Sequence, residues 1–256
     1  MQCTIQEIQH YITDMMRATV EICERNHITY YCQAGTVLGA VRHNGQIPWD
    51  HDADLIIPQN EIDRFVACAV KELPEQYYVD YFTVLPGSLR PFPRIGVKGY
   101  GTEFLHLDIF RLIGLPEDRR SQEALLSEIK VYRYRNVAMR LPFSFLARYW
   151  GRRMALLHLL LRFVPRAHYV KKIDRICNRY PYAQAKFVAN PFGRYGVKNI
   201  FEKHVYGEGQ LHDFEDFQAR IPTEADFYLK QYYGDYMQLP PEDVRKKEME
   251  RIFDVR

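Results

Sequence analysis

The spacing of apolar residues along the first 116 residues predicts helices that alternate with strands. Apolar positions recur at helical spacing in residues 5–27 and in residues 59–73, where Asn60 is expected to cap the helix. A Gly35-Thr36 turn and the Asn44-Gly45 pair enclose a further short helix. Runs rich in β-branched and aromatic residues predict strands, and these runs are 28–34, 52–58, 77–85, 92–99 and 102–116.

The second half of the chain has a different pattern. A long and mostly helical stretch is expected from about residue 118 to residue 180, and a shorter helix at residues 223–233. Within the long stretch, residues 152–164 are apolar over most of the helix circumference, with His158 and Arg162 four positions apart on one face. We therefore divide the chain into a core, residues 1–117 and 181–256, and a helical insertion, residues 118–180.

Length and composition are compatible with one large domain that carries an insertion. The chain has 256 residues, of which 47% are hydrophobic, so it can bury a sizeable core. Its five cysteines are scattered and form no CxxC pair, which argues against a disulfide framework or a structural zinc site and favours a reducing compartment. The N-terminus lacks the apolar region of a signal peptide, and no apolar run is long enough to cross a bilayer. These features favour a cytoplasmic location.

Charge separates the insertion from the rest of the chain. The net charge is +3, but residues 130–175 contain twelve Lys or Arg residues and one acid, Asp174. This basic segment either packs on the core with solvated arginines or lies on an anionic membrane surface through residues 148–175. The second interpretation would place the protein at the inner face of the membrane. Nucleic-acid binding is disfavoured, because the segment lacks a recognisable motif and the rest of the chain is acidic.

Aspartates at alternate positions precede an apolar run in the stretch "PWDHDADLIIP". In a strand, Asp52 and Asp54 would project from one face, and Asp50 joins them if residues 49–54 are extended. A solvated edge strand would explain three surface aspartates. However, the run Leu55–Ile57 has no polar alternation, which predicts a strand that is buried on both faces. Asp108 has similar apolar neighbours in "LHLDIFRL".

Clustered carboxylates of this kind need protons or cations. Two carboxylates about 4 Å apart repel each other by roughly 4 kcal/mol at an effective dielectric constant near 20. A hard divalent cation such as Mg²⁺ is bound by oxygen ligands, commonly one or two carboxylates together with substrate phosphates. The preceding Gly35-Thr36 turn is either an ordinary helix cap or an anion site at a helix N-terminus. Together, these features predict a candidate phosphoryl-transfer site.

These residues resemble the signature of the LicD family, which includes bacterial phosphocholine transferases and, more distantly, the fukutin-related proteins. The longest match is "AGTVLGAVRHNGQIPWDHDADLIIP" at residues 34–58, and a second is "LDIFRL" at residues 107–112. Looser matches are "GRYGVKNIFEKHVY" at residues 193–206 and "IPTEADFYLKQYYGDYMQLPP" at residues 221–241. The matches cover most of the chain between residues 28 and 241 but do not include the basic segment. One departure is His51, because an acid is common there in the family.

The resemblance implies an α/β (α+β) fold with a nucleotidyltransferase-like mixed sheet. It also implies transfer of a substituted phosphate from a CDP-activated alcohol to a sugar hydroxyl of a cell-surface glycan or lipid-linked sugar, with CMP leaving. The implied cofactor is Mg²⁺ or Mn²⁺. The residues that carry over as metal-binding acids are Asp50, Asp52, Asp54 and Asp108. Gly35 and Thr36 carry over as the phosphate-facing turn, and Arg42 as a residue that reaches a phosphate.

Several roles remain open at this point. Asp108 either accepts the proton of the acceptor hydroxyl or only binds the metal. Four basic residues either offset phosphate charge or are ordinary surface bases, and they are Arg42, Arg94, Lys98 and Lys203. Trp49 is expected to anchor the packing, His43 and His106 are expected to be structural, and His204 is unassigned. Two alternatives to the implied activity are nucleotidyl transfer from a nucleoside triphosphate and non-catalytic binding of a glycan or partner.

Overall fold

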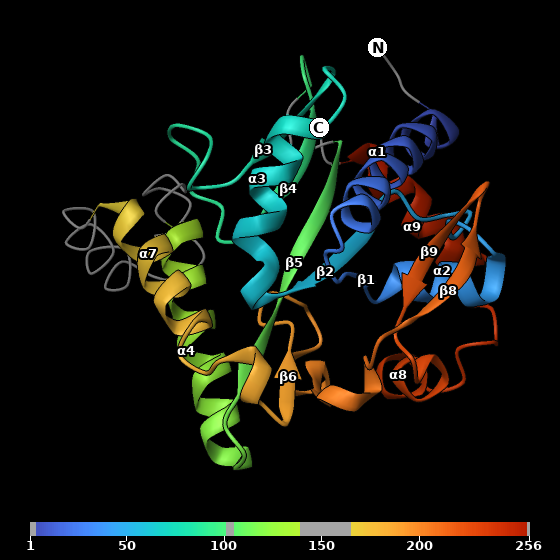
Figure 1. Cartoon of the computed structure of the whole chain (residues 1–256). Coiled ribbons are helices and arrows are strands. Elements are labelled where there is room, and N and C mark those ends of the chain that lie inside the picture. Colours follow the sequence, from blue (N-terminus) through green and yellow to red (C-terminus); the bar gives the residue numbers. More distant parts are fainter. Residues whose placement is uncertain (1–3, 101–104, 139–164, 255–256) are drawn as a thin grey trace, which may run out of the picture.

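A mixed, curved sheet forms the centre of the molecule (Figure 1). The computed structural model describes residues 4–100, 105–138 and 165–254. The strand order is β1-β2-β5-β4-β3, with β6 paired to β5 and β7 paired to β6. β2 and β5 run parallel, and the other pairs are antiparallel. The bounds are β1 Tyr31–Cys32, β2 Asp54–Pro58, β3 Tyr77–Asp80, β4 Arg94–Val97, β5 His106–Leu115, β6 Phe187–Ala189 and β7 Ile200–Glu202. The predicted α/β class is confirmed.

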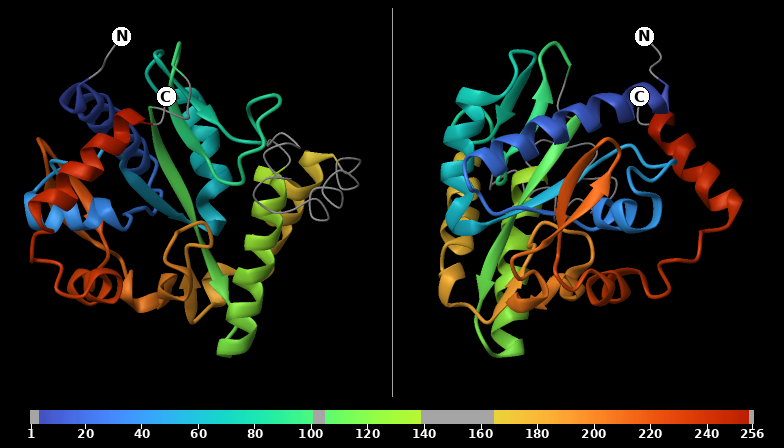
Figure 2. Two further views of the ribbon diagram at one scale, coloured as in Figure 1. Left: turned by 180° about the vertical axis from the view of Figure 1, so that it is seen from behind. Right: turned by 45° about the vertical axis from the view of Figure 1, so that its right-hand side comes forward.

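Two helices, α1 (Ile5–Arg25) and α3 (Ile62–Glu72), pack against each other and cover one face of this sheet (Figure 2). α1 begins with a capping box, in which Thr4 and Glu7 each bond the other's backbone N–H. The predicted cap at Asn60 is wrong, because Gln59–Glu61 form a short 3-10 turn and α3 begins after it.

The central strands are as buried as their apolar sequence predicted, but several are shorter. Leu55, Ile56 and Ile57 have no exposed surface, which confirms a strand that is covered on both faces. β3 ends at Asp80 although the apolar run continues to Leu85. Beyond Asp80 the chain turns, and the backbone N–H groups of Val84 and Leu85 donate to the carbonyl of Tyr81.

Helices α4 (Arg119–Ala138) and α7 (Arg166–Cys177) form an antiparallel pair beside the C-terminal half of β5 (Figure 1). They share a second apolar cluster with β5 and β6, which includes Ile113, Ile129 and Ile173. Residues 139–164, between the two helices, lie outside the described residues. The predicted apolar helix at 152–164, with His158 and Arg162, falls within this segment. Of the helices in the described part of the chain, none has the length and apolar character needed to span a membrane. The division into core and insertion stays a prediction.

The C-terminal third contains elements that the sequence did not reveal. The expected helix at 223–233 is present as α8 (Ala225–Tyr233). The sequence did not predict strands β6 and β7. It also did not predict the hairpin of β8 (Gln210–Phe214) and β9 (Phe217–Ile221), or the last helix, α9 (Glu242–Asp254). The hairpin packs on β1 and on α2 (Gly35–His43), so this region fixes the helix that follows the first strand.

Candidate active site

Three charged side chains stand in one row across the middle of the sheet. Asp54 begins β2 and is in register with Asp108 of β5, which is in turn in register with Arg94 of β4. Adjacent strands lie about 4.8 Å apart, so paired residues of this kind project side by side from one face. Arg94 donates to both carboxylate oxygens of Asp108, with its Nη2 at 3.0 Å from Oδ2. The structure therefore brings Asp54 and Asp108 together, and it pairs Arg94, which was predicted to offset phosphate charge, with Asp108.

Asp50 and Asp52 reach this row from the loop before β2. The strand begins at Asp54, so the expectation that Asp52 and Asp54 alternate within one strand is wrong. Asp50 is half-buried and accepts the backbone N–H of His51 at 2.9 Å, whereas Asp52 is exposed. The side chain of Gln9 in α1 donates to the Asp50 carbonyl at 2.7 Å. The loop is thus tied to α1 while its carboxylates face the start of β2.

The N-terminus of α2 lies against the same carboxylates. The Thr36 hydroxyl accepts the backbone N–H of Asp54 at 2.8 Å, and the Thr36 N–H donates to the carbonyl of Gln33 at 2.9 Å. A Cβ atom on Gly35 would lie 3.5 Å from Oδ2 of Asp50. Asp50 therefore approaches the positive end of the helix dipole, which favours a carboxylate there. Thr36 positions the first residue of β2.

The residue before α2 has an unusual backbone. Ala34 adopts φ 46° and ψ −108°, in a region that a residue with a side chain rarely occupies. Its backbone N–H donates to the Tyr228 hydroxyl at 2.9 Å, and that hydroxyl donates to the side chain of Gln33 at 2.9 Å. Strain of this kind costs on the order of 1–3 kcal/mol and is concentrated at functional sites. Buried tyrosines of α8 thus hold the turn that faces the carboxylates.

The carboxylates repel one another in a partly buried place. Burial raises the pKa of both Asp50 and Asp54 above the usual range, and the charge of Asp52 is the second largest cause. Asp108 adds to the effect on Asp54, whereas Arg194 acts in the opposite direction. Arg194 precedes the 3-10 turn Gly196–Asn199, and its guanidinium also lies 5.5 Å from the ring centre of Tyr195. Arg194 was not among the predicted site residues, although it lies in the third matched stretch, residues 193–206.

The donor chemistry of this cluster suits a hard divalent cation. All four carboxylates supply oxygen ligands, and their mutual repulsion is the kind of strain that a bound cation relieves. Within residues 4–100, 105–138 and 165–254, no three His, Cys, Asp or Glu side chains are already gathered around a metal-sized space. Mg²⁺ needs only one or two protein carboxylates when phosphates and water complete its shell. Asp54 and Asp108, as in-register neighbours, meet that requirement.

The other predicted substrate-binding residues lie elsewhere. Arg42 is in the last turn of α2, where its Nη1 donates to the carbonyl of Tyr236 at 2.8 Å and its guanidinium lies 5.7 Å from the ring centre of Trp49. Lys203 lies beyond the opposite end of β2, where its Nζ donates to the carbonyls of Tyr182 and Ala183. No described contact joins Arg42 or Lys203 to the carboxylates.

The residues expected to be structural, Trp49, His43 and His106, are all at least partly buried. Trp49 is buried against His43, with ring centres 5.7 Å apart, and has the guanidinium of Arg245 5.1 Å from its ring centre. His106 precedes Asp108 on the same face of β5, and burial lowers its pKa to about 4. His106 is therefore neutral at physiological pH. His204 is exposed, with Glu202 and Glu224 within 3.5 Å of its ring nitrogens.

Comparison with known proteins shows which sequences the chain is similar to. Residues 27–128, which include α2, Asp54, Arg94 and Asp108, match the family model described as "LicD/FKTN/FKRP, nucleotidyltransferase domain". The chain is 28% identical to the lipopolysaccharide cholinephosphotransferase LicD of Haemophilus influenzae, over 95% of each chain. Uncharacterized proteins of Rickettsia prowazekii and Rickettsia typhi are 47% identical over 49 residues, 19% of this chain and 18% and 16% of theirs. The predicted resemblance to the LicD family is confirmed, by the family model over residues 27–128 and by the similarity to LicD over 95% of the chain.

Proposed function

We propose that this protein transfers phosphocholine, or a similar phospho-alcohol, from a CDP-activated donor to a sugar hydroxyl of a lipopolysaccharide or related glycan. The observation that carries the proposal is the row of Asp54, Asp108 and Arg94 beside the N-terminus of α2, within the matched family domain. The similarity to a lipopolysaccharide cholinephosphotransferase over nearly the whole chain supports the substituent and the class of acceptor.

In the proposed reaction, the acceptor hydroxyl oxygen attacks the phosphorus of the phosphocholine group. A new phosphorus–oxygen bond forms to the sugar, the bond to CMP breaks, and the hydroxyl proton passes to a carboxylate of the cluster. Asp54 and Asp108 would hold Mg²⁺ or Mn²⁺, with Asp50 and Asp52 adjacent, and the ion would neutralise charge that develops on the phosphates. Arg94 keeps both oxygens of Asp108 in one orientation.

Arg194 is the basic residue that we propose contacts the donor phosphates. Its side chain is exposed and interacts electrostatically with Asp52 and Asp54, so it is available at the entrance of the carboxylate cluster. A guanidinium can donate two parallel hydrogen bonds to one phosphate. Arg42, in contrast, already donates to a backbone carbonyl and supports the segment after α8.

Calorimetric titration of CDP-choline into the protein, with and without Mg²⁺, tests this proposal. We expect binding that requires the metal and is lost in Asp54→Asn. Asp63→Asn is the matched control, because Asp63 is an exposed aspartate on α3, away from the carboxylate row. Binding that is indifferent to Mg²⁺, or unchanged in Asp54→Asn, would contradict the proposal. CDP-glycerol and CDP-ribitol as further donors would identify the alcohol.

Nucleotidyl transfer from a nucleoside triphosphate is the second candidate. It is favoured by the description of the matched domain as a nucleotidyltransferase, and it would use the same carboxylates. CTP in place of CDP-choline separates the two. Release of pyrophosphate from CTP in the presence of a glycan would support nucleotidyl transfer, whereas release of CMP from CDP-choline would support phosphocholine transfer.

A further inference from the structure

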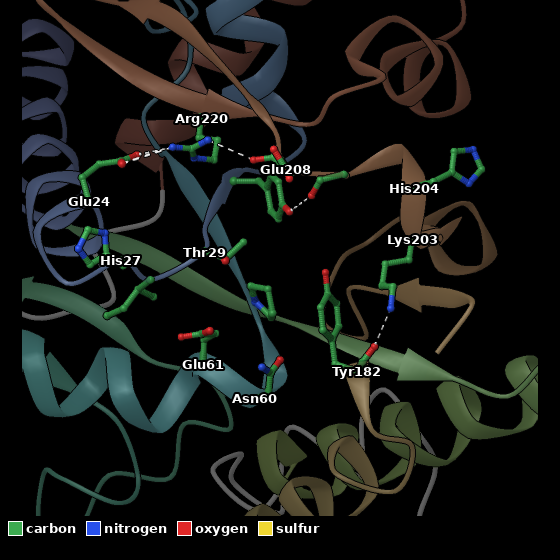
Figure 3. Close-up of a pocket in the computed structure, with 14 residues that line it drawn as sticks. Glu24, His27, Thr29, Asn60, Glu61, Tyr182, Lys203, His204, Glu208 and Arg220 are labelled. Carbon is green, nitrogen blue, oxygen red and sulfur yellow. Dashed lines mark hydrogen bonds and ion pairs between the residues drawn. The ribbon is translucent and has the colours of Figure 1, made fainter. Parts of the chain in front are cut away.

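A polar cavity lies at the other end of β2 from the carboxylates (Figure 3). It has a volume of about 650 Å³, within the range of small-molecule sites. Pro58 lines it, four residues and therefore about 13 Å along the strand from Asp54. A chain of contacting rings, Tyr31, Tyr206 and Tyr228, fills the space between this pocket and Ala34. The pocket is thus a separate site.

Four charged side chains of the pocket, those of Glu24, Glu61, Lys203 and Arg220, are already engaged with the protein. Arg220 lies 3.0 Å from Glu24 and also donates to the carbonyl of Glu208 (Figure 3). Lys203 donates to two backbone carbonyls and has its Nζ 5.4 Å from the ring centre of Tyr182. Glu61 accepts from Arg64, outside the pocket, at 3.0 Å. An anionic ligand would meet three glutamates, and a cationic ligand would meet Lys203 and Arg220, so the lining favours an uncharged ligand.

Uncharged hydrogen-bonding groups are left available in the same place. Among the described residues, the side chains of Thr29, Asn60 and His27 have no hydrogen-bond partner, and Thr29 and Asn60 point toward the middle of the pocket in Figure 3. His27 sits at φ 51°, a left-handed conformation that usually favours glycine after a helix, and this places an imidazole at the rim. The half-buried Tyr182 adds aromatic surface next to these groups.

We propose that this pocket binds a neutral sugar residue, as a second glycan site remote from the carboxylates. A sugar has hydroxyls that both donate and accept, which matches the amide of Asn60, the hydroxyl of Thr29 and the imidazole of His27. Its apolar C–H face matches the aromatic surface of Tyr182. The further step, that this sugar belongs to the acceptor, rests on the proposed function, whereas sugar binding itself does not. The site would hold one part of a glycan while another part reaches the carboxylates.

The test is saturation-transfer NMR on the full chain, titrated separately with lactose and maltose. Inorganic phosphate and choline are titrated as charged comparison ligands. The variants are Tyr182→Leu, which removes the ring, and Asn60→Ala, which truncates an exposed side chain in the short turn before α3. Tyr134→Leu is the matched control, because Tyr134 is a 57% exposed tyrosine on α4 that also has a lysine Nζ within 5.8 Å of its ring centre.

We expect at least one disaccharide to bind saturably, and both pocket variants to weaken it by at least about tenfold. Tyr134→Leu should leave the affinity unchanged. The proposal is overturned if neither disaccharide binds, if phosphate or choline competes for the pocket, or if Asn60→Ala and Tyr182→Leu bind sugar like the parent. Asp54→Asn should retain sugar binding, so a failure of the proposed transferase activity and a failure of this site give different results.

Discussion

A buried arginine links the sheet to helix α7, and removal of its charged partner should destabilise the fold. Arg111 of β5 has no exposed side-chain surface. Its guanidinium donates to the Asp174 carboxylate at 2.7 Å, to the side chain of Gln59 at 2.6 Å and to the carbonyl of Pro91 at 2.8 Å. Asp174 is the only one of these partners that carries charge. The perturbation is therefore Asp174→Ala, which leaves the buried cation with two neutral acceptors.

The expected cost follows from the burial of each partner. Removing one member of a buried ion pair costs about 3–5 kcal/mol. The Asp174 side chain is 33% exposed, so water can replace part of its interaction, and we expect a loss of about 3 kcal/mol at the lower end of that range. Asp174→Asn keeps an acceptor oxygen and should cost about 1 kcal/mol. In an Arg111→Met background the cation is absent, so adding Asp174→Ala should cost less than about 1 kcal/mol.

Urea unfolding followed by circular dichroism measures these free energies. The variants should lower the urea concentration at the midpoint of unfolding. They should keep the slope of the unfolding free energy against urea concentration, because the surface exposed on unfolding is unchanged. Asp63→Ala is the control, and as an exposed aspartate it should change stability by no more than about 0.5 kcal/mol. If Asp174→Ala costs no more than Asp63→Ala, or costs the same with and without Arg111, the inference that Asp174 compensates a buried charge is refuted.

Three further predictions concern the site and the second apolar cluster. Without Mg²⁺, Asp54→Asn should raise the free energy of unfolding by at least about 1 kcal/mol, because burial and neighbouring carboxylates oppose its charge; a lower melting temperature would contradict this. Arg194→Gln should weaken CDP-choline binding by at least about tenfold and Arg194→Lys by less, while thermal unfolding, which checks the fold, stays unchanged. Burial raises the pKa of Cys177 from 9.0 to about 11, so its contribution to stability is complete below pH 9 and is lost as the pH rises to 11. Between pH 8 and 11, urea titrations should therefore show the wild type losing about 2–3 kcal/mol more than Cys177→Ala, and equal losses would contradict the assignment.

The sequence predicted those parts of the fold in which local pattern and burial agree. α1 has both a capping box and a helical apolar stripe, and β2 is an apolar run that ends at a proline. The approach of Asp108 to Asp54 could also be expected, since both are acids at the start of an apolar strand. The hairpin β8–β9 escaped notice because its first strand is largely exposed and polar, so it has little apolar alternation to detect.

Basic partners of the carboxylates were harder to predict, because their position depends on tertiary structure. Arg94 was predicted as a phosphate-facing residue, whereas the register of the sheet sets it beside Asp108. Arg194 comes from a loop 140 residues after Asp54 in the chain, and nothing in its local sequence indicates which face it meets. A long-range contact of this kind leaves no periodic signal.

Arg42 shows how residues that are close in the chain can lie at opposite ends of one helix. It follows the Gly35-Thr36 turn by only a few residues, but the intervening chain is helical, so seven residues from Gly35 carry it about 10 Å along the axis of α2. At that end its guanidinium meets the carbonyl of Tyr236 and the ring of Trp49. Its contacts therefore fasten the segment after α8 to α2, whose opposite end faces Asp50. Because the same segment follows the tyrosines that hold Ala34, Arg42 can influence the carboxylate cluster through the position of α2 without touching a phosphate.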